Sequence, residues 1–465
     1  MLDDVVAVNV GLASLGQAVA DQGAPVADVD WRPPADGDAA TVALLQRLWG
    51  SHGDLVERAA AETVARLEAA RPQAVAVVPA REALPVLAER RLLHSGPPID
   101  WERVCDPQRR ALVAACLFEG WAHDRATAER LLARGGVGLA SGNEHGHVGP
   151  MAGVCSPSMP VWVVEDDRTR TRACSTLNEG PGATLWFGVG DDEAIARLRF
   201  LRDGLGPLLG RALDRVGPVD VLDLAAQGVQ MGDELHMRSQ ATTNLLLKVL
   251  LPAFAALGGE EEARFLAQNH LFFLNLTMAA AKCASLDAAG PRGSPVVTLM
   301  ARNGTDMGLQ VAGLPGRWFT APAARVQDAL LRDGHEPQDA ALDIGDSAVI
   351  ECLGLGGMAL AAAPLTASFF GGTVADAVAR TELMAELCVA RSERFRIPAL
   401  DLGGSPVGID ARLVVELGVA PQITTGVLHA SSGAGQIGAG VAHQPVEPFR
   451  AALVALAADL DAGRA

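Results

Sequence analysis

The chain has 465 residues, of which 49% are hydrophobic and 20% charged, and its formal net charge at pH 7 is −17. This composition is typical of an ordered globular protein of two or three domains and excludes large-scale disorder. The acidity argues against nucleic acid or an anionic membrane as the main partner, because the long-range field repels both, and any bound anion needs local arginines.

The cysteines and the start of the chain indicate the compartment. Seven cysteines are scattered without a CxxC pair, mostly in apolar surroundings, which predicts reduced and buried thiols. The start MLDDVVAVNV is acidic where a signal peptide is basic, so we expect a cytoplasmic protein. The uncharged run 352–375 is long enough to span a membrane, but five glycines and Pro364 favour a buried helix broken by turns.

The first predicted elements form a βαβ unit. Residues 4–30 contain an apolar run, a glycine turn, an amphipathic segment and a second apolar run. A third strand is expected at 74–80, so residues 1–98 predict a Rossmann-like α/β domain with a doubly wound parallel sheet. Gly11 and Gly16 do not match the GxGxxG fingerprint, so a CoA or nucleotide site is the weaker alternative here.

Two further regions follow. Residues 99–142 predict a small helical module, because an apolar stripe at helical spacing follows a linker. Residues 143–465 predict a larger, glycine-rich α+β domain, in which a helical insertion is expected near 241–284. The tail EPFRAALVALAADLDA predicts an amphipathic closing helix.

The segment VVTLMARNGTDMGLQVAG predicts a β-hairpin. Asn303 and Gly304 lie between two β-compatible runs, and both residue types tolerate positive φ. A turn alone does not require the polar side chains beside it, which are Arg302, Thr305 and Asp306. A glycine-flanked tip of this kind also suits a small anion or metal site, with Asp306 as orienting carboxylate or metal ligand. The two interpretations do not exclude each other.

The segment NEHGHVGPMAG carries two histidines two positions apart. On an extended segment His145 and His147 share a face, so they could bind a metal or act as acid and base. No third ligand stands at a spacing typical of zinc, and a plain surface loop is the remaining interpretation.

Two more segments could contact a ligand. In STLNEGPGATLWFG, Asn178 and Glu179 stand at a glycine-bounded corner, where backbone N–H groups can receive an oxyanion. In QMGDELHMRSQATTN, Arg238 and Asn244 belong to a polar cluster that suits either a binding site or a solvated helix start.

Glycine turns near the C-terminus carry further polar groups. The loop TTGVLHASSGAGQIGAG, with Gly435 and Gln436, lacks a P-loop lysine and favours a phosphate ester smaller than a nucleoside triphosphate. Asp343, Asp346 and Asp410 adjoin glycine turns, where they could hold a cation or, more commonly, cap helices.

Several of these blocks together resemble the AllG/YlbE family. The likeness covers about residues 8 to 456 and is carried by NVGLASLGQAVADQGAPVADVDWRPPADGD, VGPMAGVCSPSMPVWVVE, LNEGPG, QMGDELHMR, VTLMARNGTDMGLQVAG, DIGDSAVIE and GIDARLVVELGVAPQITTGVLH. The resemblance implies a subunit of oxamate carbamoyltransferase in purine and allantoin breakdown. That enzyme interconverts oxalurate and phosphate with oxamate and carbamoyl phosphate.

Carbamoyl transfer needs cations for the leaving phosphate, donors for the carbonyl oxygen and a base for a weakly nucleophilic amide. The expected cationic contacts are Arg302, Arg238 and Arg317. The expected proton acceptor is His145 or His147, and the expected donors are Asn178, Asn303 and glycine N–H groups. The other expected substrate contacts are Glu179, Asn244, Gly304, Thr305, Gly435 and Gln436. On this hypothesis, Arg302→Ala abolishes turnover and leaves the fold intact.

The resemblance also implies partners, namely FdrA-type and AllH-type subunits. The expected substrates are small anions, and a homo-oligomer is expected because symmetric oligomers are common. The sequence identifies no definite cofactor, and a divalent cation such as Mg²⁺ is a candidate, with Asp306 as its ligand. The alternative hypothesis is a non-catalytic subunit that completes a site on a partner.

Overall fold

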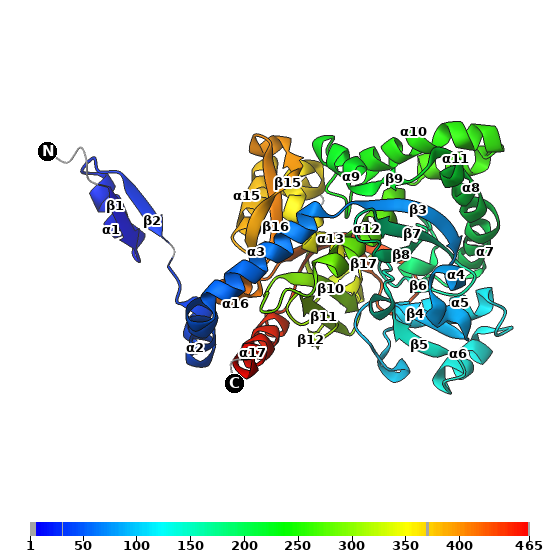
Figure 1. Ribbon diagram of the computed structural model, residues 1–465, viewed down its shortest axis with the longest axis horizontal. Coiled ribbons are helices and arrows are strands. Elements are labelled where there is room, and N and C mark those ends of the chain that lie inside the picture. The colour runs from blue at the N-terminus through cyan, green and yellow to red at the C-terminus, as the bar shows by residue number, and fades with distance from the viewer. Residues whose placement is uncertain (1–5, 30, 369–371, 464–465) are drawn as a thin grey trace.

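The computed structural model describes residues 6–29, 31–368 and 372–463. Strands β1 (Ala7–Val10) and β2 (Val26–Val29) pair in parallel around helix α1 (Ala13–Ala20), which confirms the predicted βαβ unit. In Figure 1 this unit lies apart from the body of the molecule, to which α2 (Ala39–Gln46) and the long α3 (Gly53–Ala69) lead.

The third predicted strand belongs to a different sheet. Strand β3 (Pro72–Pro79) pairs antiparallel with β7 (Pro160–Asp166) and β9 (Val219–Asp220), and β8 (Arg172–Thr176) completes the order β8-β7-β3-β9. The doubly wound parallel sheet predicted for residues 1–98 is therefore wrong. Apolar periodicity marked the strand correctly, but it does not encode the direction or sequence distance of the pairing partner.

The predicted helical module is present as helices but is not separate from its neighbours. Its helices are α5 (Asp106–Phe118) and α6 (Arg125–Ala133). They connect β4 (Arg91–His94) to β5 (Gly138–Ser141), which pair in parallel, while β6 (Val154–Cys155) pairs antiparallel with β4. Strand pairing thus crosses both expected boundaries, at 98 and at 142.

A helical layer covers one end of the body (Figure 1). It comprises α7 (Asp192–Phe200), α8 (Gly206–Val216), α9 (Val221–Gln230), α10 (Gln240–Leu257) and α11 (Glu260–Gln268). The next helix, α12 (Phe272–Ala288), is buried along almost its whole length. It contacts β7, β8, α3, β10 and α13 (Val349–Cys352), so it forms the centre of the core and not a peripheral insertion.

Among the described residues, length and composition alone would allow one helix, α10, to cross a membrane. Helices α11 and α12 pass the same test together, but they are bent by 80° at their break. Helix α10 packs against α8, α9, α11 and α12.

The C-terminal half contains three small antiparallel sheets. Strands β10 (Val297–Asn303), β11 (Asp306–Val311), β12 (Phe319–Pro322) and β14 (Ile344–Gly345) form the first, β13 (Val326–Leu331), β17 (Gln422–Leu428) and β18 (Gln436–His443) the second, and β15 (Cys388–Ile397) and β16 (Gly403–Ile409) the third. The register of β10 with β11 pairs Arg302 with Met307, which confirms the predicted hairpin at Asn303 and Gly304.

The remaining α-helices differ in place. Helix α4 (Ala80–Ala83) packs against β3 and β7, and the C-terminal half contains α14 (Pro364–Ser368), α15 (Val374–Ala385), α16 (Ala411–Leu417) and α17 (Glu447–Ala462). The last is the predicted closing helix. The uncharged run 352–375 forms short, mostly buried helical turns as far as Ser368, and its residues 369–371 lie outside the described part. All seven cysteines are free, and five of them are buried.

Candidate functional site

A cavity of about 560 Å³ brings together several of the predicted glycine corners. Residues that line it come from four segments, within 180–189, 269–271, 330–332 and 433–439, and Met237 lines it as well. We call this cavity the glycine pocket. Its size is in the usual range for small-molecule sites.

Asparagine side chains hold the corner at one wall of the glycine pocket. The Asn178 side chain accepts from Gly180 N at 3.0 Å and from Asn269 Nδ2 at 2.9 Å, and its own amide donates to Asn275 Oδ1 at 2.9 Å. Gly180 has φ +80°, which favours glycine. Asn178 is buried and does not line the cavity, so it holds the corner in place without facing a ligand.

Glu179 closes the same corner. Its carboxylate accepts from the backbone N–H groups of Leu185 at 2.7 Å and Trp186 at 3.2 Å. Burial raises the pKa of Glu179 to about 7. The Trp186 indole N–H has no acceptor among the residues described, although Trp186 lines the glycine pocket. Buried donors normally find a partner, so this unpaired N–H is an exception in the wall of the glycine pocket.

The opposite wall is the turn between β17 and β18 together with the end of β13. It supplies the polar side chains of Gln436 and Arg332, which approach each other at 3.5 Å. Arg332 is exposed and provides a guanidinium at the edge of the glycine pocket. Gly435 has φ +78° and shapes the turn, while its neighbours Ala434 and Gln436 line the cavity.

The break between α11 and α12 contributes a histidine. His270 lines the glycine pocket, and its backbone carbonyl accepts from Ser239 Oγ at 3.2 Å. Partial burial, and then the nearby Arg238 guanidinium, lower the pKa of His270. The imidazole is therefore neutral at physiological pH and able to accept a proton.

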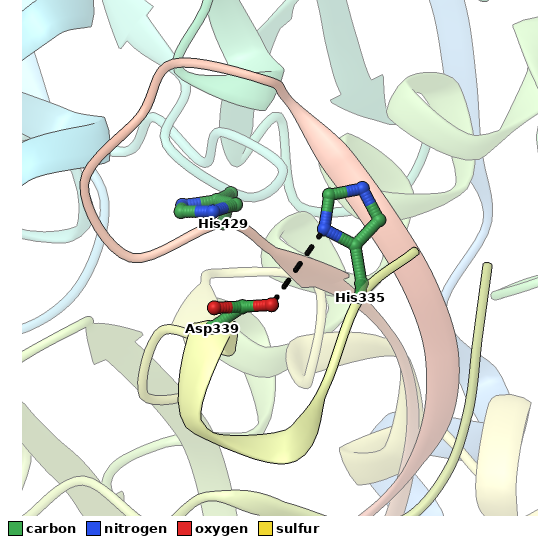
Figure 2. A group of neighbouring side chains, drawn as sticks. All are labelled: His335, Asp339 and His429. Carbon is green, nitrogen blue, oxygen red and sulfur yellow. Dashed lines mark ion pairs between the residues drawn. The ribbon is translucent and has the colours of Figure 1, made fainter. Parts of the chain in front are cut away.

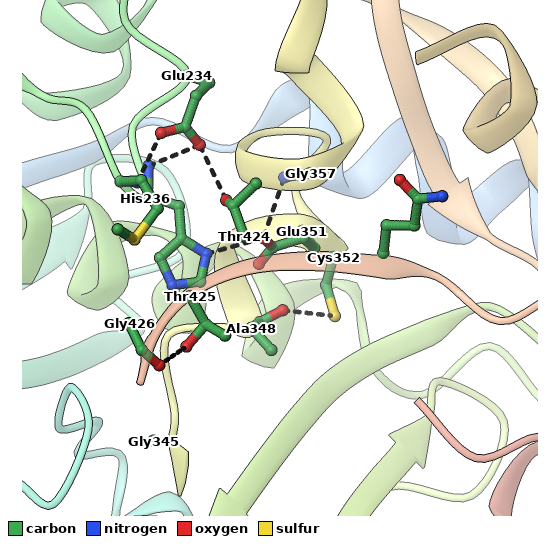
Figure 3. A network of polar contacts seen from close by, with 12 residues as sticks. Glu234, His236, Gly345, Ala348, Glu351, Cys352, Gly357, Thr424, Thr425 and Gly426 are labelled. Carbon is green, nitrogen blue, oxygen red and sulfur yellow. Dashed lines mark hydrogen bonds and ion pairs between the residues drawn. The ribbon is translucent and has the colours of Figure 1, made fainter. Parts of the chain in front are cut away.

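A buried network fixes the segment that supplies Met237 and Arg238 (Figure 3). The Glu234 carboxylate accepts from three successive backbone N–H groups, those of residues 236 to 238, and from Thr424 Oγ1 at 3.2 Å. His236 Nδ1 lies 2.8 Å from Glu351 Oε1. These contacts tie the polar cluster predicted near Arg238 to β17, one of the strands that carry the opposite wall.

Arg302 does not share the glycine pocket. Its guanidinium is completely buried and binds both oxygens of Asp343, at 2.7 and 3.0 Å, and the Gly345 carbonyl at 2.5 Å. Gln444 Nε2 also donates to Asp343, at 3.0 Å. Arg302 therefore lies apart from the expected substrate contacts at the glycine pocket, and its donors are paired within the protein.

The histidines of NEHGHVGPMAG lie elsewhere as well. His147 is buried beside Gly142 and Cys174, and burial lowers its pKa to about 3. It therefore lacks the near-neutral pKa expected of a general base. His145 is partly exposed in a turn at Gly142–His145, and neither histidine lines the glycine pocket.

The other residues predicted around the hairpin make contacts within the protein. Asn303 Oδ1 accepts from the backbone N–H groups of Thr305 and Asp306, at 3.0 and 2.7 Å, and Gly304 has φ +77° in the turn. Thr305 Oγ1 donates to the Arg103 carbonyl at 2.9 Å. Asp306 pairs with Arg103 at 2.8 Å.

Three more predicted residues lie away from the glycine pocket. Arg317 is exposed, with its guanidinium 5.1 Å from the centre of the Phe319 ring, and Asn244 is exposed on α10. Asp410 accepts from Arg412 N at 2.8 Å, which confirms it as the cap of α16.

One group has the composition of a metal site. The potential ligand atoms of His335, Asp339 and His429 lie within 4.8 Å of one another (Figure 2). However, His429 Nδ1 accepts from the N–H groups of Ser431 and Ser432, at 3.2 and 3.1 Å. This leaves the proton on Nε2, so His429 has no free lone pair without rearrangement. The three side chains suit a role in holding the loop after β17 in place better than a role as metal ligands.

Sequence reasoning missed His270 and Arg332. His270 stands in the polar interruption QNH of an otherwise apolar helical stretch, which is the signal that marks it. Arg332 follows an ordinary strand and carries no local signal, since only the pairing of β13 with β18 brings it to Gln436.

Comparison with known proteins places the chain beside AllG proteins. Residues 137–347 match the family described as oxamate carbamoyltransferase subunit AllG. The chain is 41% identical over 416 residues to the oxamate carbamoyltransferase subunit AllG of Escherichia coli K12, covering 88% of this chain and 99% of that protein. It is 36% identical to the uncharacterized protein YahG of the same organism, covering 96% of both.

A solved structure agrees with the fold. A conserved protein of unknown function from Enterococcus faecalis V583 superposes with a TM-score of 0.84 at 37% identity. The match covers 87% of this chain and 98% of that one.

Proposed function

The chain belongs to the AllG family of oxamate carbamoyltransferase subunits, and from this premise we propose that it works in a complex that transfers a carbamoyl group between carbamoyl phosphate and oxamate or a similar small amide. The observation that carries the proposal is the 41% identity to an AllG subunit over 99% of its length. The name of that relative supports the view that this chain is a subunit of such a transferase. That the chemistry takes place on this chain is our inference.

The glycine pocket is the proposed place of the reaction. The amide nitrogen of oxamate attacks the carbamoyl carbon, a C–N bond forms, the C–O bond to phosphate breaks, and the amide loses a proton. Arg332 and Gln436 would bind the phosphate and His270 would accept the proton. The backbone N–H groups of Gly182 and Ala183, which line the glycine pocket, would bind the carbonyl oxygen. These roles replace those predicted for Arg302, His145 and His147, while Glu179 and Asn178 position the corner.

The partners proposed for the complex are FdrA-type and AllH-type subunits in the cytoplasm. The subunit name of the relative supports a complex, since a subunit implies other chains. Addition and removal of Mg²⁺ with EDTA in the assay below tests the proposed divalent cation.

The experiment is an assay of phosphate-dependent oxalurate cleavage by the purified chain, alone and with each partner subunit. We expect activity only in the complex, and we expect Arg332→Met to lower kcat/KM by about 100-fold, as removal of one donor to a developing charge does. Arg211→Met is the control, because Arg211 is exposed on α8 and does not line the glycine pocket. Undiminished activity in Arg332→Met would contradict the proposed site.

The alternative is a non-catalytic subunit that completes a site on a partner. The exposure of Arg332 fits this alternative, because a partner subunit could cover the edge of the glycine pocket at that residue. In that case Arg332→Met and His270→Gln weaken assembly measured by size-exclusion chromatography without lowering kcat of the assembled complex. A CoA or nucleotide subunit would instead show saturable binding of such a ligand by calorimetry.

A further inference from the structure

A second cavity, of about 360 Å³, lies between α12, the β10–β11 hairpin and the turn at Gly142–His145. Its polar lining includes Lys282, Asn143, Ser285, Thr298 and Gln310. We call it the lysine cavity. Exposed residues such as Glu144 and Leu286 also line it, so it opens to solvent.

Lys282 is the unusual group in the lysine cavity. Its side chain is only 3% exposed, yet it makes no hydrogen bond or ion pair with any part of the chain that the structure describes. Burial of an ammonium without a partner is costly, and it lowers the pKa of Lys282 to about 8. At physiological pH the group still carries a charge most of the time.

The choice of lysine at this position is also unusual. Of the 38 Lys and Arg residues, only Lys248 and Lys282 are lysines. Nearly all cationic side chains of the protein are arginines, and one of its two lysines lies in this cavity. A compact ammonium suits a small ligand at close range, where the wider guanidinium does not fit.

Asp346 is the carboxylate that interacts with Lys282 through space, but its oxygens already accept hydrogen bonds. They accept from Gly96 N at 2.6 Å, Asn143 Nδ2 at 2.8 Å and Gly149 N at 2.9 Å. Asp346 favours the charged form of Lys282 through space without forming a hydrogen bond to it. The ammonium therefore keeps its donors for another acceptor.

Two neighbours of Lys282 also lack partners. Ser285 Oγ and Asn143 Oδ1 are buried and make no hydrogen bond in the described part of the chain. Because Asn143 Nδ2 is fixed by Asp346, the free atom of this amide is its acceptor. A matching ligand thus brings an anionic oxygen for Lys282 and an N–H or O–H donor for Asn143.

We propose that the lysine cavity is a binding site, separate from the glycine pocket, for a small carboxylate that also carries an N–H donor. Glu144 at the opening disfavours ions of higher charge, such as phosphate. The proposal stands on the lysine cavity alone and does not depend on the transferase function.

The test is a titration of the full chain by calorimetry with oxamate as probe, and with oxalate and inorganic phosphate as comparisons. We expect saturable binding of oxamate that is at least about tenfold weaker in Lys282→Met, and weaker binding of oxalate, which has no N–H. Lys248→Met is the matched control, because Lys248 is exposed on α10. Absence of saturable binding, or equal affinity in Lys282→Met, overturns the proposal.

Two further variants separate the sites. Leu286→Trp fills the opening of the lysine cavity without changing its charge, and it should block binding even if Lys282→Met fails to fold. Arg332→Met disables only the glycine pocket. Oxamate binding that survives Leu286→Trp but is lost in Arg332→Met overturns this proposal and leaves the proposed function standing, whereas the reverse pattern supports it.

Discussion

Arg302 and Asp343 form a completely buried ion pair, with Gln444 as an additional donor to the carboxylate. Removing one member of such a pair leaves an uncompensated charge in the core, which costs about 3–5 kcal/mol. We therefore expect Arg302→Met to lower the free energy of unfolding by this amount in urea titrations. If the Arg302 variant instead kept the wild-type free energy of unfolding and lost activity, the hypothesis that Arg302 binds substrate would be supported.

His147 makes stability depend on pH. Its folded-state pKa of about 3 is depressed below the ordinary 6.5, so the unfolded chain binds the extra proton between these values. The stability contributed by neutral His147 is present above pH 6.5 and is lost as the pH falls towards 3, by up to about 1.4 kcal/mol per pH unit. Unfolding free energies of wild type and His147→Gln, measured from pH 7 to 4, should differ in slope, and parallel curves would contradict the assignment.

Among the secondary-structure elements, the N-terminal βαβ unit has the least support from its surroundings. A two-stranded parallel sheet is marginal alone, and this one exposes Val8, Val10, Leu12 and Leu15 by 56–70%. We expect a chain that lacks residues 1–32 to keep the melting temperature of the full protein, because the core lies in the body. A fall of several degrees on truncation, measured by circular dichroism, would show that the unit contributes to the core.

Local patterns predicted several elements and missed their arrangement. The hairpin at Asn303, the cap at Asp410 and the closing helix all follow from a few adjacent residues. The direction of β3 does not, since its partner β7 stands far along the chain. The glycine pocket was predicted in part, because the corner at Glu179 and the turn at Gln436 meet, while His270 and Arg332 depend on long-range packing.

At the scale of the whole molecule, α12 joins regions that the sequence divides into separate domains. It packs against the sheet of β7 and β8 on one side and against β10 and α13 on the other. Residues of this helix share one hydrophobic cluster with residues of both parts, so we expect a single calorimetric unfolding transition for residues 33–463. Two resolved transitions would favour the predicted division near residue 142.

The acidity of the chain acts at the same scale. With a formal charge of −17, small anions are repelled at long range and bind only where buried or clustered cations prevail locally. Lys282 and Arg332 are two such cations, and each stands beside neutral amide groups.

The Asp346 carboxylate accepts hydrogen bonds from the loops at Gly96 and Gly149 and so holds them close together. The neighbouring glycines leave no space for a larger side chain. A methyl group on Gly96 would lie 2.5 Å from the backbone nitrogen of Asn303, and one on Gly345 would lie 2.5 Å from that of Met151. Insertions or side chains at this crossing would separate backbones that touch. Evolutionary drift in loop length should therefore spare these turns and accumulate at the solvent-facing edges, so that natural variants differ in outline while sharing an unchanged centre.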